Sequence, residues 1–288
     1  MRSVTPHFSA AIGLSMVLGL SSPGESGKAL AADIGPGGVP FADFGRSSNE
    51  KPDLAHVDFS VPIPPTVLRE LKTDDLLKMN QEQLDQLYAR LHSGPVPSGV
   101  YDGKIVLAND GGLKRLAALA VEMKLQGGVD FGTKVLDFFV AGKNFYKRQG
   151  IVRNRIEHAR WLSFPIAPFG VRWDEVPMST IGNSTAHELF PAKYYCGQSL
   201  LDSRRESIVI DYAYNDDIAG YQPKLDYLMN RSGALIRDEM RMIRPGFYLA
   251  RMYANRVFLM NYVLHSDGAE IANHSDDACW SPPMANQR

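Results

Sequence analysis

Apolar and polar residues alternate along most of the chain from Val100 to His265, which is the period of a strand that buries one face. The predicted strands are Tyr101–Ala108, Val135–Phe145, Ile151–His158, Val171–Val176, Tyr194–Leu201, Glu206–Tyr214, Leu235–Ile243, Phe247–Ala254 and Val257–His265. The polar turn at 202–205 joins two of them as a hairpin. Many short consecutive strands predict an antiparallel barrel or a strongly curved sheet, with a sandwich as the competing architecture.

A helical period precedes these strands. Apolar residues recur at i, i+3, i+4 and i+7 at Leu84, Leu87, Tyr88 and Leu91. Asn80 and Gln83 resemble a capping box at the start of this helix. A shorter helix is expected over Thr66–Met79, and a lateral helix over Leu113–Leu125. The predicted fold class is therefore mainly β (α+β), an antiparallel barrel or strongly curved sheet with N-terminal helices and one lateral helix. Its strand pattern resembles the calycin-like type of barrel.

The chain divides into five segments by composition. Residues 1–32 form a predicted signal peptide, and residues 33–65, rich in Gly, Pro, Ser and Asp, a predicted extended linker or arm. A helical cover follows at 66–92, and the barrel-like domain at 93–266. The polar residues 267–288 are expected to form a flexible C-terminal tail.

The first residues have the layout of an export signal. Arg2 is followed by an apolar run at Phe8–Leu20, and the A-x-A site at 29–31 places cleavage after Ala31 or Ala32. The alternative is a retained membrane anchor. Cleavage would leave a mature chain without a transmembrane segment, in the periplasm or outside the cell. In that oxidising compartment Cys196 and Cys279 could form a disulfide, although two unrelated thiols remain the alternative.

Composition and motifs exclude several classes of function. The chain has 288 residues, a formal net charge of −1 and 22% charged residues, so nothing favours nucleic acid or an anionic membrane as a partner. His187-Glu188 begins a metalloprotease motif, but Pro191 stands where the second His is required. A serine-hydrolase elbow, a phosphate-binding loop and a haem-attachment motif are also missing from the sequence. We therefore expect no metal and no cofactor.

One acid stands out in the strand expected at 235–243. Ile236, Asp238, Met240 and Met242 share one face of this strand, and the charged residues between them share the other. A carboxylate among apolar neighbours is costly unless it is paired or protonated. The sequence therefore marks Asp238 as a candidate functional residue.

The expected hairpin register supplies partners for this acid. If Pro245-Gly246 forms the tip, Met240 lies opposite Arg251 and Asp238 lies opposite Tyr253. The next strand adds Tyr262 to the same face. In one interpretation Asp238 and Arg251 form a buried ion pair that fixes the register. In the other, Asp238, Arg251, Tyr253, Tyr262 and Met240 line a ligand cavity. A one-residue slip would break the grouping.

A second acid, Asp211, lies in the strand expected at 206–214. Ile208, Ile210 and Tyr212 share one face of it, and Asp211 lies on the opposite face. Asp211 is either a second inward acid that lines the cavity or an exposed edge residue. Two acids close together would permit general acid–base chemistry.

Several stretches resemble a group of bacterial proteins that have no established function. They are GPVPSG at 94–99, IVIDY at 208–212 and IRDEMRMIRPGFYL at 236–249, followed by Asn261-Tyr262. The group carries an IRDExRxxxPGxYLG motif near its C-terminus, and Ala250 departs from the final glycine. The resemblance covers roughly 84–264 and implies no catalytic residue. The strand pattern is also similar to the calycin type of barrel, whose members bind lipids, pigments or haem.

Three functions are consistent with these features. The first is an exported protein that binds an apolar or amphipathic small molecule, such as a fatty acyl chain or an isoprenoid, in a barrel cavity. The second is an isomerase, hydrolase or lyase that acts on such a ligand, with a tyrosine or Asp238 transferring the proton. The third is a structural or interaction module with a packed barrel.

Overall fold

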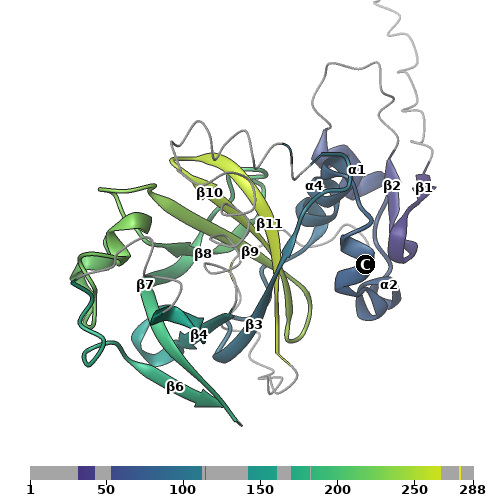
Figure 1. Ribbon diagram of the computed structural model, residues 1–288. Helices are drawn as coiled ribbons and strands as arrows, with labels where there is room; N and C mark the ends of the chain where they lie inside the picture. The colour runs from purple at the N-terminus through teal and green to yellow at the C-terminus, as the bar shows by residue number, and fades with distance from the viewer. Residues whose placement is uncertain are drawn as a thin grey trace, which may run out of the picture.

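Eight antiparallel strands close into a barrel in the computed structural model, which describes residues 32–42, 53–111, 114, 142–160, 170–181, 183–266 and 279 (Figure 1). The strands are β3 (Gly99–Val106), β4 (Gly142–Tyr146), β5 (Ile151–Ile156), β7 (Ser184–Gln198), β8 (Glu206–Asp211), β9 (Ile236–Arg244), β10 (Phe247–Ala254) and β11 (Val257–His265). Their order is β5-β4-β3-β11-β10-β9-β8-β7, and the pairing of β5 with β7 closes the barrel. The predicted antiparallel barrel is confirmed.

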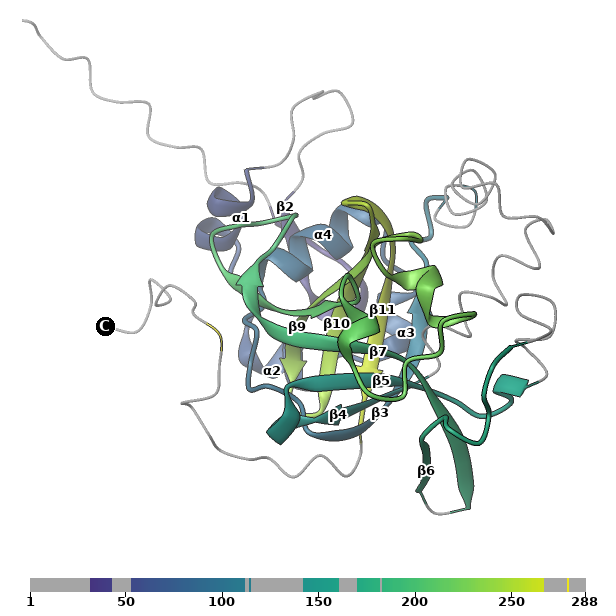
Figure 2. The same ribbon diagram turned by 90° about the vertical axis from the view of Figure 1, so that its left-hand side faces the viewer.

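The long strand β7 differs most from its prediction. It begins at Ser184 rather than at Tyr194, and its first residues form a hairpin with β6 (Met178–Ile181). This hairpin projects beyond the barrel wall (Figure 2). The strand predicted at 171–176 is wrong. Residues 173–175 form a turn there, which the Glu175 amide closes by donating to the Arg172 carbonyl over 3.0 Å.

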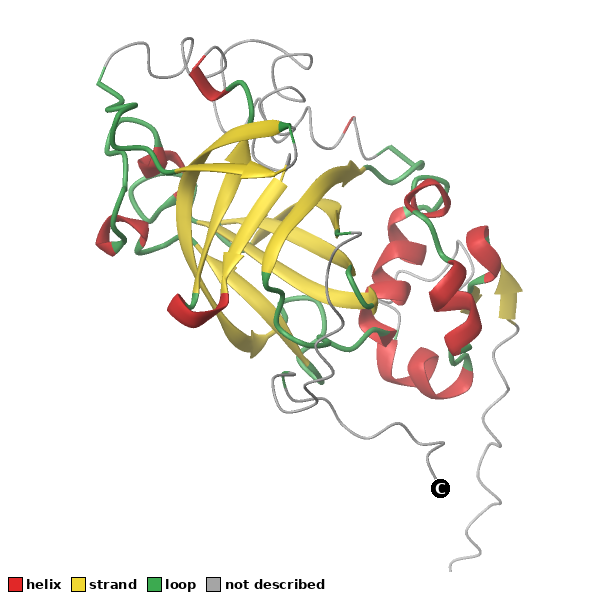
Figure 3. Ribbon diagram, turned by 90° about the horizontal axis from the view of Figure 1, so that it is seen from below, coloured by secondary structure: helices red, strands yellow, loops and turns green. Residues whose placement is uncertain are grey.

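Four short helices lie together on one side of the barrel (Figure 3). They are α1 (Leu54–Ser60), α2 (Pro65–Glu70), α3 (Thr73–Leu76) and α4 (Gln81–Arg90). The capping box at Asn80 and Gln83 is confirmed, because each side chain accepts a hydrogen bond from the other residue's backbone amide. The helix predicted over 66–79 is interrupted at residues 71–72, which separate α2 from α3.

The segment expected to be an extended arm is partly folded. A hairpin of β1 (Ala32–Ile34) and β2 (Pro40–Ala42) encloses a single 3-10 turn at Pro36–Gly38, and α1 follows further along. Val39 and Phe41 are buried against the helices. Further 3-10 turns within the described ranges are Lys147–Gln149, Asn215–Asp217 and Asp226–Met229. Of the predicted lateral helix only Lys114 is described; residues 1–31 and most of the predicted tail lie outside the described residues.

Two hydrophobic cores follow from the alternation of side chains across the barrel wall. The inner core lies inside the barrel and includes Phe145, Val152, Ile208, Met240, Ala250 and Leu264. The outer core lies between the helices and the outer face of the wall, and it includes Leu84, Leu87, Ile243, Phe247, Leu249 and Val263. The helices at 66–92 therefore lie against the outer face of the barrel wall. None of the described helices combines the length and the apolar character needed to cross a bilayer.

Arg241 of β9 connects the helical layer to the barrel wall. Its side chain is fully buried, and its Nε donates to Ser207 Oγ over 3.0 Å. The two remaining nitrogens donate to backbone carbonyls at the end of α4 and in the turn before β8, those of Tyr88, Ala89, Asp202 and Arg205. One guanidinium thus satisfies carbonyls from two segments of the chain that are far apart in sequence.

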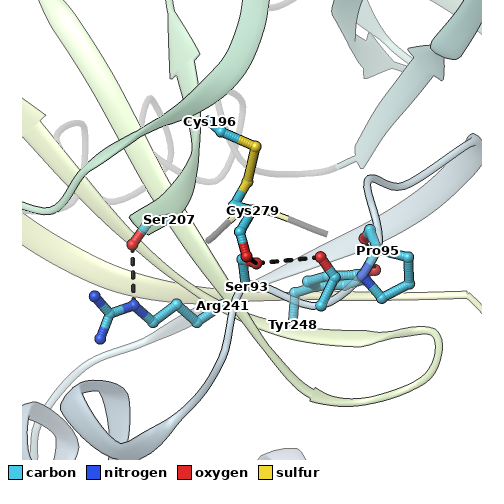
Figure 4. Close-up of a disulfide and its surroundings, with 8 residues drawn as sticks. Ser93, Pro95, Cys196, Ser207, Arg241, Tyr248 and Cys279 are labelled. Carbon is cyan, nitrogen blue, oxygen red and sulfur yellow. Dashed lines mark hydrogen bonds between the residues drawn. A yellow bond between two sulfur atoms is a disulfide. The ribbon is translucent and has the colours of Figure 1, made fainter. Parts of the chain in front are cut away.

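A disulfide joins Cys196 of β7 to Cys279, across 83 positions of sequence. Figure 4 shows it beside the segment that carries Ser93 and Pro95. The Ser93 hydroxyl donates to the Cys279 carbonyl over 3.3 Å, and the Tyr248 hydroxyl donates to the Pro95 carbonyl over 2.7 Å. Cys279 is buried in the inner core. This end of the barrel is therefore bound to two segments outside the sheet.

Removing the disulfide should weaken the fold measurably. We expect Cys196→Ser to lower the free energy of unfolding by about 2 to 4 kcal/mol, because the open chain gains entropy when it unfolds. Urea denaturation with and without a reductant measures the change. Cys279→Ser and the double variant should lose the same amount, since all three lack the same single bond. A double variant that is clearly less stable than either single variant would contradict this.

Candidate functional site

The register between β9 and β10 differs from the prediction by one residue. Arg244 lies opposite Phe247 as expected at the Pro245-Gly246 turn, but Met242 is then paired with Tyr248, so Ile243 bulges out of the ladder. Asp238 consequently lies opposite Met252 rather than opposite Tyr253. A shift of one residue moves every following side chain of β10 to the other face.

This bulge places Arg251 and Tyr253 on the outer wall of the barrel, away from Asp238. The predicted pairing of Arg251 with Asp238 is therefore wrong. Arg251 instead forms an ion pair with Asp85 of α4, and its Nε donates to the Tyr253 hydroxyl over 2.9 Å. Its guanidinium also lies 4.2 Å from the centre of the Phe258 ring. These contacts hold α4 against the wall.

A second bulge, at Leu259, sets the register of β11. Met252 pairs with Met260 while Tyr253 pairs with Phe258, so Leu259 is left between the two pairs. Tyr262 then points into the barrel, where its hydroxyl donates to Asp238 Oδ2 over 2.7 Å. Asp238, Met240 and Tyr262 thus share the inner face, and all three are buried.

Lys143 of β4 is the cation that Asp238 meets inside the barrel. Its Nζ lies 3.2 Å from Asp238 Oδ2, and both side chains are 0% exposed. The same nitrogen donates to Asn154 Oδ1 over 2.8 Å and to the Tyr212 hydroxyl over 2.7 Å. Lys143, Asn154, Tyr212, Asp238 and Tyr262 together form what we call the interior polar cluster.

One polar atom of the interior polar cluster has no hydrogen-bond partner among the described residues. The three protons of the Lys143 ammonium have three acceptors, and the Tyr212 hydroxyl lies 3.0 Å from Asn154 Oδ1. The donors to Asp238 all meet at Oδ2. Asp238 Oδ1 is buried and accepts no hydrogen bond from any residue that the structure describes. A buried acceptor on a charged group is energetically unfavourable when it has no hydrogen-bond donor. A ligand that donates a hydrogen bond to Oδ1 would therefore be stabilised there.

Burial controls the protonation of the groups around this atom. Desolvation lowers the pKa of Lys143, and the neighbouring Asp238 charge partly opposes this. Desolvation and the Asp238 charge both raise the pKa values of Tyr212 and Tyr262 well above the ordinary value. Both tyrosines therefore keep their protons near neutral pH and act as hydrogen-bond donors.

Asp211 does not join the interior polar cluster. It ends β8, is partly exposed, and accepts a hydrogen bond from the Tyr195 hydroxyl over 2.9 Å. Its other oxygen accepts from the Ala213 amide over 2.8 Å. Asp211 therefore caps the end of a strand on the outer surface. Of the two interpretations of its position, the exposed one fits the structure and the inward one does not.

Sequence analysis missed Lys143 and Asn154 and gave Tyr212 no role. The sequence pattern could have identified both residues. Lys143 shares a strand face with Phe145, and Asn154 lies between Val152 and Ile156 on one face. A polar residue on an otherwise apolar strand face is the criterion that singled out Asp238. Applied to β4 and β5, it identifies two further members of the interior polar cluster.

Comparisons with known proteins give no functional assignment. No protein-family model matches the chain, and no curated protein matches it. A crystal structure described as a protein from Thermomonospora curvata is 15% identical in sequence, and the match covers 66% of this chain and 89% of that chain with a TM-score of 0.33. The function therefore has to follow from the geometry of the barrel itself.

Proposed function

We propose that this is an exported protein that binds an apolar or amphipathic small molecule inside its barrel. The observation that supports this most strongly is Asp238 Oδ1, a buried carboxylate oxygen that no described residue of the chain satisfies. Binding sites for small molecules commonly combine apolar walls with a few convergent polar groups. The interior polar cluster and the apolar inner core supply these two parts.

The inner core can adapt to a ligand because of its methionines. Met240, Met252 and Met260 are buried close to Asp238 along and across the strands. Unbranched methionine side chains change rotamer easily and accommodate irregular apolar shapes. A bound chain would displace them from their present positions without a change in the barrel wall.

Binding is better supported than catalysis. A general acid or base works best with a pKa near the working pH. The raised pKa values of Tyr212 and Tyr262 make both poor proton donors in the chemical sense. The alternative isomerase, hydrolase or lyase would thus depend on the Lys143–Asp238 pair for proton transfer.

Export to an oxidising compartment is part of the proposal. The Cys196–Cys279 disulfide is the kind of bond that persists in the periplasm or outside the cell. Cleavage after Ala31 would leave Ala32, the first residue of β1, at the new N-terminus.

A fluorescent apolar probe tests whether the barrel is the binding site. We expect N-phenyl-1-naphthylamine to bind the wild-type protein with increased fluorescence, and Ala250→Leu to weaken this binding at least tenfold. Ala250 is fully buried in the inner core, so a larger side chain there occupies the space that a ligand would take. Circular dichroism shows whether the variant remains folded.

The matched control is the neighbouring residue on the opposite face. Leu249 belongs to the outer core, and Leu249→Met conserves its volume, so probe binding should be unchanged. If folded Ala250→Leu binds the probe as tightly as the wild type, the probe does not occupy the barrel, and a packed structural barrel becomes the better interpretation.

A further inference from the structure

We infer that the barrel selects a ligand whose polar end is an uncharged hydrogen-bond donor, such as a long-chain alcohol; this rests on the proposed function. The inference begins with Asp238 Oδ1. An oxygen of an ionised carboxylate can only accept, and the donors from Tyr262 and Lys143 both lie at the other oxygen, Oδ2. A hydroxyl group donates to Oδ1, whereas an ether or an ester oxygen cannot.

The charges of the interior polar cluster exclude a ligand whose polar end is a carboxylate or an ammonium group. Lys143 and Asp238 lie within 3.2 Å of one another, so the interior polar cluster carries no net charge when both are ionised. A carboxylate ligand would bring a second negative charge beside Asp238 without a further cation. An ammonium ligand would add a positive charge beside Lys143. In both cases a buried charge would remain uncompensated, and this is strongly unfavourable.

The residues around Asp238 indicate that the rest of the ligand is apolar. Its direct neighbours across the sheet are Ile210 of β8 and Met252 of β10, both buried and apolar. Continuing along β9, the inner face carries Met240, which lies opposite Ala250 and Ile208. None of these neighbouring residues is charged. They would therefore contact a hydrocarbon chain that extends from the hydroxyl group of the ligand.

A series of ligands with one chain length and different polar ends tests the inference. The probes are 1-dodecanol, dodecyl methyl ether, dodecanoate and dodecylammonium, each used to displace N-phenyl-1-naphthylamine from the wild-type protein. The alcohol should bind about tenfold to a hundredfold more tightly than the ether, because only the alcohol donates to a charged acceptor. It should also bind more tightly than either ion.

Asp238→Asn tests the role of the oxygen directly. This variant should lose most of the preference for the alcohol over the ether, since an amide group can turn a donor toward the ligand. Glu239→Gln is the matched control, because Glu239 is equally buried but faces the outer wall, where it accepts from the Leu200 amide over 3.0 Å. The control should keep the preference of the wild type.

The outcomes separate the two proposals. Equal affinities for all four ligands, or tightest binding of an ion, would overturn the inference about the polar end and leave the barrel as the binding site. Failure of all four ligands to displace a bound probe would overturn both the inference and the proposed function. The comparison within the wild-type protein holds even if Asp238→Asn does not fold.

Discussion

Replacing Arg241 by alanine is expected to lower the free energy of unfolding by about 4 kcal/mol. The side chain is fully buried, and its removal leaves the carbonyls of Tyr88, Asp202 and Arg205 without this donor. Unsatisfied buried acceptors cost more than the bonds themselves contribute. The helical layer should therefore detach from the barrel at lower denaturant concentrations than in the wild type, which urea denaturation followed by far-UV circular dichroism would measure.

Two further variants test whether the loss of stability is specific to the Arg241 guanidinium. Arg241→Lys keeps the charge but offers a single nitrogen, so it should recover only a small part of the loss. Arg204→Ala removes a partly exposed arginine that bonds to Asp202 in the same turn, and should cost less than about 1 kcal/mol. If Arg241→Ala is no more harmful than Arg204→Ala, Arg241 does not connect the two layers.

Replacing Lys143 by methionine should also cost about 4 kcal/mol, because it leaves Asp238 as an uncompensated charge inside the barrel. The double variant Lys143→Met with Asp238→Asn removes both charges. We expect it to be more stable than the sum of the two single losses by roughly 2 kcal/mol. Free energies of unfolding of the four proteins, obtained by urea denaturation, complete the cycle.

Lys104→Met is the control for this cycle. Lys104 of β3 forms an ion pair with Asp74 over 3.7 Å, but both side chains are mostly exposed, so its loss should change the stability by less than about 1 kcal/mol. Additive losses for Lys143 and Asp238 would show that the two residues do not interact as an ion pair, and the interior polar cluster would lose its central contact.

The barrel follows closely from the sequence, and the reason is the strength of its period-two pattern. Strands β10 and β11 have the predicted bounds, and the inner face of β9 is the one that carries Asp238. These strand bounds and faces depend on side chains that are close together in sequence. The outer face of the same strands packs against the apolar face of α4.

The relative faces of β9, β10 and β11 could not be predicted, because they depend on two single-residue bulges. Ile243 and Leu259 are ordinary apolar residues, and nothing in their identity distinguishes a bulged from a paired position. Each bulge reverses the face of the residues beyond it. Arg251, which an unbroken ladder would bring to Asp238, therefore lies on the outer wall with Asp85.

The contact between Lys143 and Asp238 depends on closure of the barrel. β4 belongs to the other half of the sheet, and its side chains meet those of β9 only across the interior. Such contacts are not encoded by the period of either strand. The sequence could have marked Lys143 as a polar residue on an apolar face, but only the closed barrel brings it to the acid.

The position of the helical layer determines the order in which the protein can fold. α4 contacts residues that follow it by a long stretch of chain; the bond from Arg241 to Tyr88 spans 153 positions, and that from Arg251 to Asp85 spans 166. During synthesis the helices therefore emerge long before the strands that they cover. Contacts this distant in sequence slow folding. The nascent chain can therefore bury the apolar face of α4 against the barrel wall only after its last strands have been made.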